Sequence, residues 1–164
     1  MLPFLSTDSK EQTMGFLDNL KSNSQQMSEQ LKTKTGQLKN KDFARGSMAM
    51  CALIAAADGS IDAAEKQKTT GLITSNDTLS IFDAGELRDL FQHFASKLEA
   101  DYDFGKVEAI QAIGKLKKKP DQARAVIQLG IIIGGADGSF DADEQRAVRE
   151  ACNAVGISPS EFEL

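Results

Sequence analysis

The chain has 164 residues, of which 41% are hydrophobic and 26% charged, and this composition predicts one compact soluble domain with its own core. Its formal net charge of -5 argues against nucleic acid as a general partner and favours cations or basic protein surfaces. The two cysteines are too few for a disulfide framework, and no apolar run approaches the ~20 residues of a membrane-spanning helix. We therefore expect a cytoplasmic protein without a signal peptide.

Residues 1–38 are predicted to lie outside the main fold. Met14 begins a natural start, Met-Gly-Phe-Leu, so residues 1–13 are treated as a leader. From residue 14 to 38, apolar side chains recur at a sparse helical spacing among lysines and other polar residues. This pattern is typical of a flexible, amphipathic, basic arm, and it leaves residues 39–164 as a single helical domain.

The rest of the chain predicts an all-α fold of about seven helices. Helical periodicity indicates helices from Asp42 to a first acidic turn, then over 62–75, 83–98, 103–118, 125–136 and 141–155, with a last short turn at 158–161. For the helix at 103–118, the predicted inner face is Phe104, Val107, Ile110, Ile113 and Leu116. Gly130 and Gly134 are spaced four apart in the helix at 125–136 and predict close backbone packing against a neighbour.

One short stretch occurs twice. Residues 57–65 read Ala-Asp-Gly-Ser-Ile-Asp-Ala-Ala-Glu and residues 136–144 read Ala-Asp-Gly-Ser-Phe-Asp-Ala-Asp-Glu, so seven of nine positions match at an offset of 79. Such a match indicates an internal duplication, with two pseudo-repeated halves at about 42–75 and 121–155. The run at 125–136 could form a strand by local preference, but its Ala- and Met-rich counterpart at 46–57 favours a helix.

The repeated turns carry the candidate site residues, which are all acidic: Asp58, Asp62, Glu65, Asp137, Asp141 and Glu144. Helix capping explains four of them, because Asp62 and Asp141 precede a helix and Glu65 and Glu144 stand at the third helical position. Asp58 and Asp137 instead follow a helix C-terminus, where a negative charge is unfavourable. Either they bind a cation, or their side chains bond only to local backbone, as in an Asp-Gly turn.

A cation at these turns would be a hard one that takes oxygen ligands, because no His or Cys lies nearby. Calcium is the first choice, and magnesium or manganese are alternatives. An EF-hand is excluded by spacing, since Ala63 and Ala142 occupy the position of the required glycine.

These motifs resemble one known family. The duplicated Ala-Asp-Gly-Ser-apolar-Asp-x-x-Glu turns, the Lys-Asn-Lys-Asp-Phe lead-in at 39–43, the Glu-Lys-Gln after the first turn and the Ala-Val-Arg-Glu after the second are similar to the TerB family of bacterial tellurite-resistance proteins. The resemblance implies two pseudo-repeated helical bundles and a metal-binding role for the six acidic residues. It also implies a stress-response system with TerD-type and TerC-type partners, the latter a membrane protein, so peripheral association with the cytoplasmic membrane is expected.

Two alternatives to a metal-binding interaction module remain open. A metal-independent scaffold could dock partners on opposed acidic and basic faces, the basic one formed by the arm and by Lys115, Lys117, Lys118 and Lys119. A thiol-dependent tellurite-processing enzyme would need a reactive Cys51 or Cys152, yet both stand at apolar helical positions. His93 is the only histidine, and no catalytic pair, phosphate loop or small-molecule site is recognisable. A non-enzymatic protein is therefore predicted.

Overall fold

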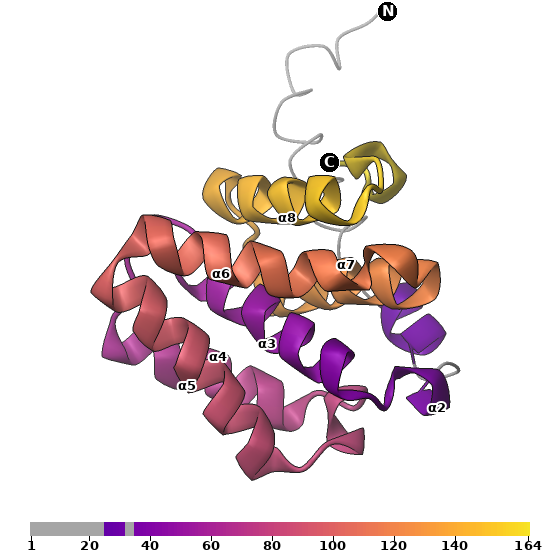
Figure 1. Cartoon of the computed structure of the whole chain (residues 1–164), viewed down its shortest axis with the longest axis horizontal. Coiled ribbons are helices and arrows are strands. Elements are labelled where there is room, and N and C mark those ends of the chain that lie inside the picture. The colour runs from indigo at the N-terminus through magenta and orange to yellow at the C-terminus, as the bar shows by residue number, and fades with distance from the viewer. Residues whose placement is uncertain (1–24, 32–34) are drawn as a thin grey trace, which may run out of the picture.

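A computed structural model describes residues 25–31 and 35–164, and the regular structure of these residues is entirely helical (Figure 1). The all-α prediction is confirmed. The predicted leader, 1–13, and parts of the predicted arm, 14–24 and 32–34, lie outside the described residues. The α-helices are α2 (Thr35–Leu38), α3 (Lys41–Ala55), α4 (Ala63–Ser75), α5 (Ala84–Ala100), α6 (Tyr102–Gly114), α7 (Pro120–Gly134) and α8 (Ala142–Val155), and the 3-10 turns are η2 (Leu79–Ile81), η3 (Lys115–Lys118) and η4 (Pro159–Phe162).

Helix α3 is the centre of the fold. Asn40 caps its N-terminus, where the side-chain oxygen accepts a hydrogen bond from the Phe43 backbone nitrogen at 2.9 Å. From Phe43 to Ala55 every residue except Arg45 is buried. In Figure 1, α3 passes between α4 and α5 on one side and α6, α7 and α8 on the other. A helix that is apolar on nearly all sides needs such neighbours around it.

Helix α5 buries the stripe that its sequence predicts. Leu87, Phe91, Phe94, Ala95 and Leu98 are each at most 3% exposed, which follows from their spacing on one helical face. Asp83 caps the helix by accepting a hydrogen bond from the Glu86 backbone nitrogen at 2.9 Å.

The predicted inner face of α6 is wrong at its N-terminal end. Phe104 is 77% exposed and Val107 is 55% exposed. The buried face carries small residues instead, among them Gly105 and Ala109. A Cβ atom at Gly105 would lie 2.5 Å from the Leu98 backbone nitrogen, so α6 can approach α5 closely only through its small residues. Periodicity alone favoured the larger side chains.

Helix α7 begins at Pro120 and continues through the apolar run that the repeat assigned to a helix. Its glycines do pack closely, but against side chains and not backbone. A Cβ atom at Gly130 would lie 2.8 Å from Met50 Cγ, and one at Gly134 would lie 2.9 Å from Phe140 Cε1. These contacts join α7 to α3 and to the turn that precedes α8.

Part of the predicted arm packs onto this core. Residues 25–31 are helical, and Leu31 and Leu38 are fully buried. The Gln128 side-chain amide of α7 donates a hydrogen bond to the Gln30 side-chain oxygen at 2.8 Å. In the described residues, therefore, the chain before residue 39 contributes apolar side chains to the same core.

The two copies of the repeated sequence have the same local conformation. Helix α7 begins and ends 79 residues after α3, and α8 begins 79 residues after α4. The glycines of the two turns both have positive φ, +97° at Gly59 and +83° at Gly138, a region that favours glycine. Each turn therefore directs the chain from a buried helix into a more polar one.

Candidate functional site

The first acidic turn joins α3 to α4. Asp58 folds back on the turn, and its Oδ1 atom accepts hydrogen bonds from the Ser60 backbone nitrogen at 3.1 Å and the Ser60 hydroxyl at 3.4 Å. Asp62 caps α4, because its Oδ1 atom accepts from the Glu65 backbone nitrogen at 2.7 Å. The side chain of Ile61 between them is buried and anchors the turn to the core.

The second turn, between α7 and α8, repeats these bonds. Asp137 Oδ1 accepts hydrogen bonds from the Ser139 backbone nitrogen at 3.1 Å and the Ser139 hydroxyl at 3.0 Å. Asp141 and Glu144 form a full capping box: Asp141 Oδ1 accepts from the Glu144 backbone nitrogen at 2.8 Å, and Glu144 Oε1 accepts from the Asp141 backbone nitrogen at 3.1 Å. The predicted capping roles of Asp62 and Asp141 are confirmed.

These contacts give Asp58 and Asp137 a structural role as well. Each uses one carboxylate oxygen to close its own turn through a backbone N–H and a serine hydroxyl, as the Asp-Gly alternative requires. The other oxygen of Asp137, Oδ2, contacts the Lys68 ammonium group of α4.

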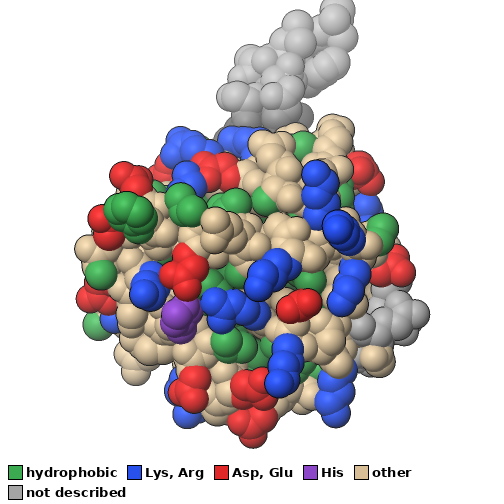
Figure 2. Space-filling model, in the orientation of Figure 1, with side chains coloured by type: hydrophobic (Ala, Val, Ile, Leu, Met, Phe, Trp, Pro, Cys, Tyr) green, Lys and Arg blue, Asp and Glu red, His purple; other side chains and the backbone are tan. Residues whose placement is uncertain are grey.

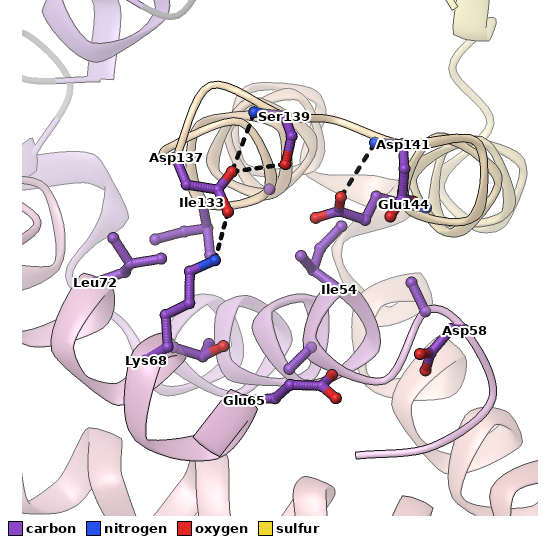
Figure 3. Close-up of a pocket in the computed structure, with 14 residues that line it drawn as sticks. Ile54, Asp58, Glu65, Lys68, Leu72, Ile133, Asp137, Ser139, Asp141 and Glu144 are labelled. Atoms are coloured by element: carbon purple, nitrogen blue, oxygen red, sulfur yellow. Dashed lines mark hydrogen bonds and ion pairs between the residues drawn. The ribbon is translucent and has the colours of Figure 1, made fainter. Parts of the chain in front are cut away.

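Both turns contribute to one pocket. It has a volume of about 220 Å³ and lies between α4 and the second turn (Figure 3). Its acidic lining residues are Asp58, Glu65, Asp137, Asp141 and Glu144, and Lys68 is the basic one. Ile54, Leu72 and Ile133 supply apolar wall. Asp62 is not among the lining residues, so five of the six predicted site residues meet at this pocket.

Comparison with known proteins decides the family. The family profile described as "Tellurite resistance protein TerB" matches residues 44–164. A curated "Tellurium resistance protein TerB" from Alcaligenes sp is 34% identical over 118 residues, which cover 72% of this chain and 97% of that protein. The chain belongs to the TerB family of tellurite-resistance proteins. No solved structure matches it.

The lining of the TerB pocket contains five carboxyl groups and one lysine, Lys68, so the lysine balances only part of the negative charge. Burial, and then the charges of Asp141 and Asp137, raise the pKa of the Glu144 carboxyl to about 7, although the Asp141 backbone N–H opposes the shift. The pKa of Glu65 is also raised, first by burial and then by the charges of Asp62 and Asp58. These two carboxyl groups would be stabilised in their charged form by an added cation.

The contact with Lys68 changes the pKa of Asp137 in the opposite direction. The hydrogen bond from the Lys68 ammonium group lowers the pKa of the Asp137 carboxyl, and the same bond raises the pKa of Lys68. Both groups are therefore charged at neutral pH, and Lys68 is the ammonium ion that the pocket already contains.

The carboxylates surround the pocket without forming a finished ligand shell. Within residues 25–31 and 35–164, no three His, Cys, Asp or Glu side chains are grouped closely enough to hold one metal ion. The donors that line the pocket are nonetheless mainly oxygen atoms, and one positively charged group, the Lys68 ammonium, is already held there (Figure 3). Oxygen donors of this kind are the ligands that hard cations prefer in proteins.

The two cysteines of this TerB chain are poorly suited to act as nucleophiles. Cys51 and Cys152 are completely buried, and burial raises the pKa of their thiols to about 12 and about 11, respectively. A thiol with such a pKa supplies almost no nucleophilic thiolate at neutral pH. This finding agrees with their interpretation as inert core residues.

The single histidine, visible on the face drawn in Figure 2, takes part in a small cluster of polar side chains. His93 Nε2 of α5 lies 2.7 Å from Glu108 Oε1 of α6, and an Arg45 guanidinium nitrogen of α3 lies 3.7 Å from the same oxygen. Arg45 also stacks over the Phe94 ring at 5.0 Å. These contacts connect three helices, which gives His93 a structural role.

Exposed lysines and the length of the helices bear on how the protein could contact partners or a membrane. Lys115, Lys117, Lys118 and Lys119 are exposed at η3, but on the face shown in Figure 2 basic and acidic side chains are interspersed. In the part of the chain that the structure describes, no helix is both long and apolar enough to cross a bilayer.

Proposed function

We propose that this TerB protein is a non-enzymatic, cation-binding interaction module of a tellurite-resistance system. The observation that carries the proposal is the meeting of both acidic turns at one pocket. Five carboxylates line it and one lysine opposes them. A divalent cation there would neutralise part of the excess negative charge and join two turns that are far apart in the sequence.

The proposed ion is a hard divalent cation. The lining residues include neither histidine nor cysteine, so zinc and softer metals have no preferred ligand there. Calcium remains the first choice because it tolerates irregular oxygen shells, with magnesium or manganese as alternatives.

The residues proposed to hold the ion are those that face the pocket. Asp58 and Glu65 would contribute from the first half, and Asp141 and Glu144 from the second. Asp137 would join them if it released Lys68. Asp62 is proposed to act indirectly, since it caps α4 and so fixes the helix that carries Glu65. Bound water would complete the shell.

The partners proposed for this module are those that the family resemblance implies: TerD-type proteins and a TerC-type membrane protein. Binding of an ion would order the two turns, and the ordered surface could then be recognised by a partner. Such a role is compatible with a cytoplasmic protein that associates peripherally with the membrane. A metal-independent scaffold is the alternative, and salt-sensitive partner binding that persists in chelator would favour it.

The proposal is tested by titrating the full chain with calcium or magnesium while recording amide NMR spectra. The test variant is Asp58→Asn with Asp137→Asn, which keeps an oxygen acceptor in each turn. The matched control is Asp83→Asn with Asp101→Asn, which removes two charges at helix caps of α5 and α6, where Asn also caps well.

Saturable shifts at both turns in the wild type and control, lost in the test variant, are expected. Absent shifts, or equal shifts in all three proteins, would refute the cation site.

A further inference from the structure

Two neighbouring apolar side chains of α6 are exposed at the surface. Phe104 is 77% exposed and Val107 is 55% exposed, and within residues 25–31 and 35–164 they are the only large apolar side chains that are exposed. Single exposed apolar residues scattered over a surface are ordinary, whereas a contiguous apolar patch marks an interaction site. The position of both residues on one helix therefore points to a contact surface.

The patch extends along α6 as a stripe. Phe104, Val107 and Ile110 are spaced three residues apart, which places them in one row about 9 Å long, and Ile110 is half-buried. We call these three residues the α6 stripe. The buried face of the same helix carries Gly105 and Ala109, so α6 is apolar on two sides. A helix that is apolar all round is typical of a protein interior, and the stripe is the side of α6 that this chain leaves uncovered.

A shallow groove runs along the stripe and carries charges of both signs. It has a volume of about 330 Å³ and is lined by Val107, Ile110, Gln111 and Lys106 of α6 and by Glu150 of α8. Helix α8 lies beside α6 (Figure 1). Lys106 Nζ lies 2.6 Å from Glu150 Oε2, so the groove contains one cation and one anion. This balance favours neither a strongly acidic nor a strongly basic partner, and a surface that binds a copy of itself needs both charges.

We propose that the α6 stripe is a dimer contact, at which a second copy of this chain packs its own α6 antiparallel about a two-fold axis at Val107. Positions equally far from residue 107 then face each other, so Phe104 meets Ile110 of the second copy, and Val107 meets its own counterpart. Lys106 and Glu150 lie on one flank of the stripe. Each Lys106 therefore lies beside Glu150 of the second copy as well as its own.

The contact is small, and this sets the strength of the dimer. A row of three apolar side chains on each copy, with one reciprocal pair of charges, covers less surface than a standard protein interface. We therefore expect a reversible dimer with a dissociation constant on the order of 100 µM. The inference does not depend on the proposed cation site, and it is tested in chelator so that the two proposals fail separately.

The first measurement is sedimentation equilibrium of the full chain from about 10 µM to about 1 mM, a range that brackets the expected dissociation constant. The wild type is compared with Val107→Glu, which brings two carboxylates together at the two-fold axis. Because Val107 is exposed in the single chain, circular dichroism should show an unchanged fold. Association of Val107→Glu should be at least about tenfold weaker than that of the wild type.

The second measurement exchanges charges between copies. Lys106→Glu leaves two acidic groups in the groove and Glu150→Lys leaves two basic ones, so each variant alone should associate more weakly than the wild type. An equimolar mixture of the two should associate at least about tenfold more strongly than either alone, because opposite charges then meet across the axis. The matched control is the same exchange at the pair formed by Lys66 and Glu99, which lies outside the groove. Lys66→Glu and Glu99→Lys should each dimerise within about twofold of the wild type.

Three results would overturn the proposal. A wild type that stays monomeric at the highest concentration would show that another occupant, such as a different protein, covers the stripe. A dimer that Val107→Glu leaves intact would lie on another face of the molecule. A mixture of Lys106→Glu and Glu150→Lys that associates no better than its components would show that these two groups do not meet across a two-fold axis.

Discussion

The capping glutamate of the second turn offers a direct test of the pocket's electrostatics. Glu144 has a folded-state pKa of about 7, above the ordinary value of ~4.3. Between about pH 4 and pH 7 the folded protein therefore binds more protons at this site than the unfolded chain does. The contribution of Glu144 to the free energy of unfolding therefore falls as pH rises through that window. Above pH 7 the full cost of burying the charged carboxylate is present. Glu144→Gln removes the titration but keeps an oxygen for the capping box.

The size of the effect follows from the shift. Each pKa unit corresponds to about 1.4 kcal/mol, so a rise from ~4.3 to about 7 sets an upper limit of roughly 3.8 kcal/mol. Glu144 is only partly buried, and solvent screening reduces this figure to about 1–2 kcal/mol. We expect Glu144→Gln to be more stable than wild type by that amount at pH 8, and to match it within about 0.5 kcal/mol at pH 4.

The assay is urea unfolding followed by circular dichroism, in chelator, from pH 4 to pH 8. Glu86→Gln is the matched control, because Glu86 holds the same position behind the cap of α5 but is exposed. The control should change the free energy of unfolding by no more than a few tenths of a kcal/mol at any pH. If Glu144→Gln keeps the wild-type pH dependence, or is less stable than wild type at pH 8, then burial and the neighbouring carboxylates do not destabilise the charged form of Glu144.

Two further predictions concern the core. Gly105→Ala should destabilise the protein by about 2–3 kcal/mol in the same unfolding assay, because the Cβ atom of the new alanine would meet the Leu98 backbone. The control Gly71→Ala should be neutral or stabilising, because there is open space around Gly71. Equal effects of the two substitutions would contradict the close contact between α5 and α6. Cys51 and Cys152 should not react with a thiol reagent in the native protein and should both react in denaturant, because burial raises the pKa of each thiol. Rapid reaction of either cysteine with the reagent in the native protein would favour the alternative of a thiol-dependent enzyme.

The sequence predicts helices well where one face is apolar and the other polar. The stripe of α5 is such a case, and its Leu87, Phe91 and Phe94 are buried as expected. Helix α6 has apolar residues on more than one face, and periodicity favoured the face with the larger side chains. The choice is made by the backbone of α5 near Leu98, which leaves room only for Gly105. A tertiary contact of this kind leaves no signal in local periodicity.

The same limit applies to the site. Repetition and capping spacing identify the acidic residues, because both are local properties of the sequence. They do not reveal that Asp58 and Glu144 line the same pocket, since that depends on how the two halves pack. Lys68 was missed for a related reason: it lies on a polar helix that carries a second lysine, Lys66. Its spacing of three from Glu65, which places both on one face of α4, was the available signal.

The most direct test of the central claim is a manganese titration of the full chain followed by amide NMR, because bound Mn²⁺ broadens signals close to it. If one cation lies in the pocket between the two turns, signals of residues 58–60 and 137–139 should broaden together and at the same sub-stoichiometric manganese concentration, and excess calcium or magnesium should restore them. Broadening of one turn without the other, or broadening spread over exposed acids elsewhere, would contradict a shared cation site.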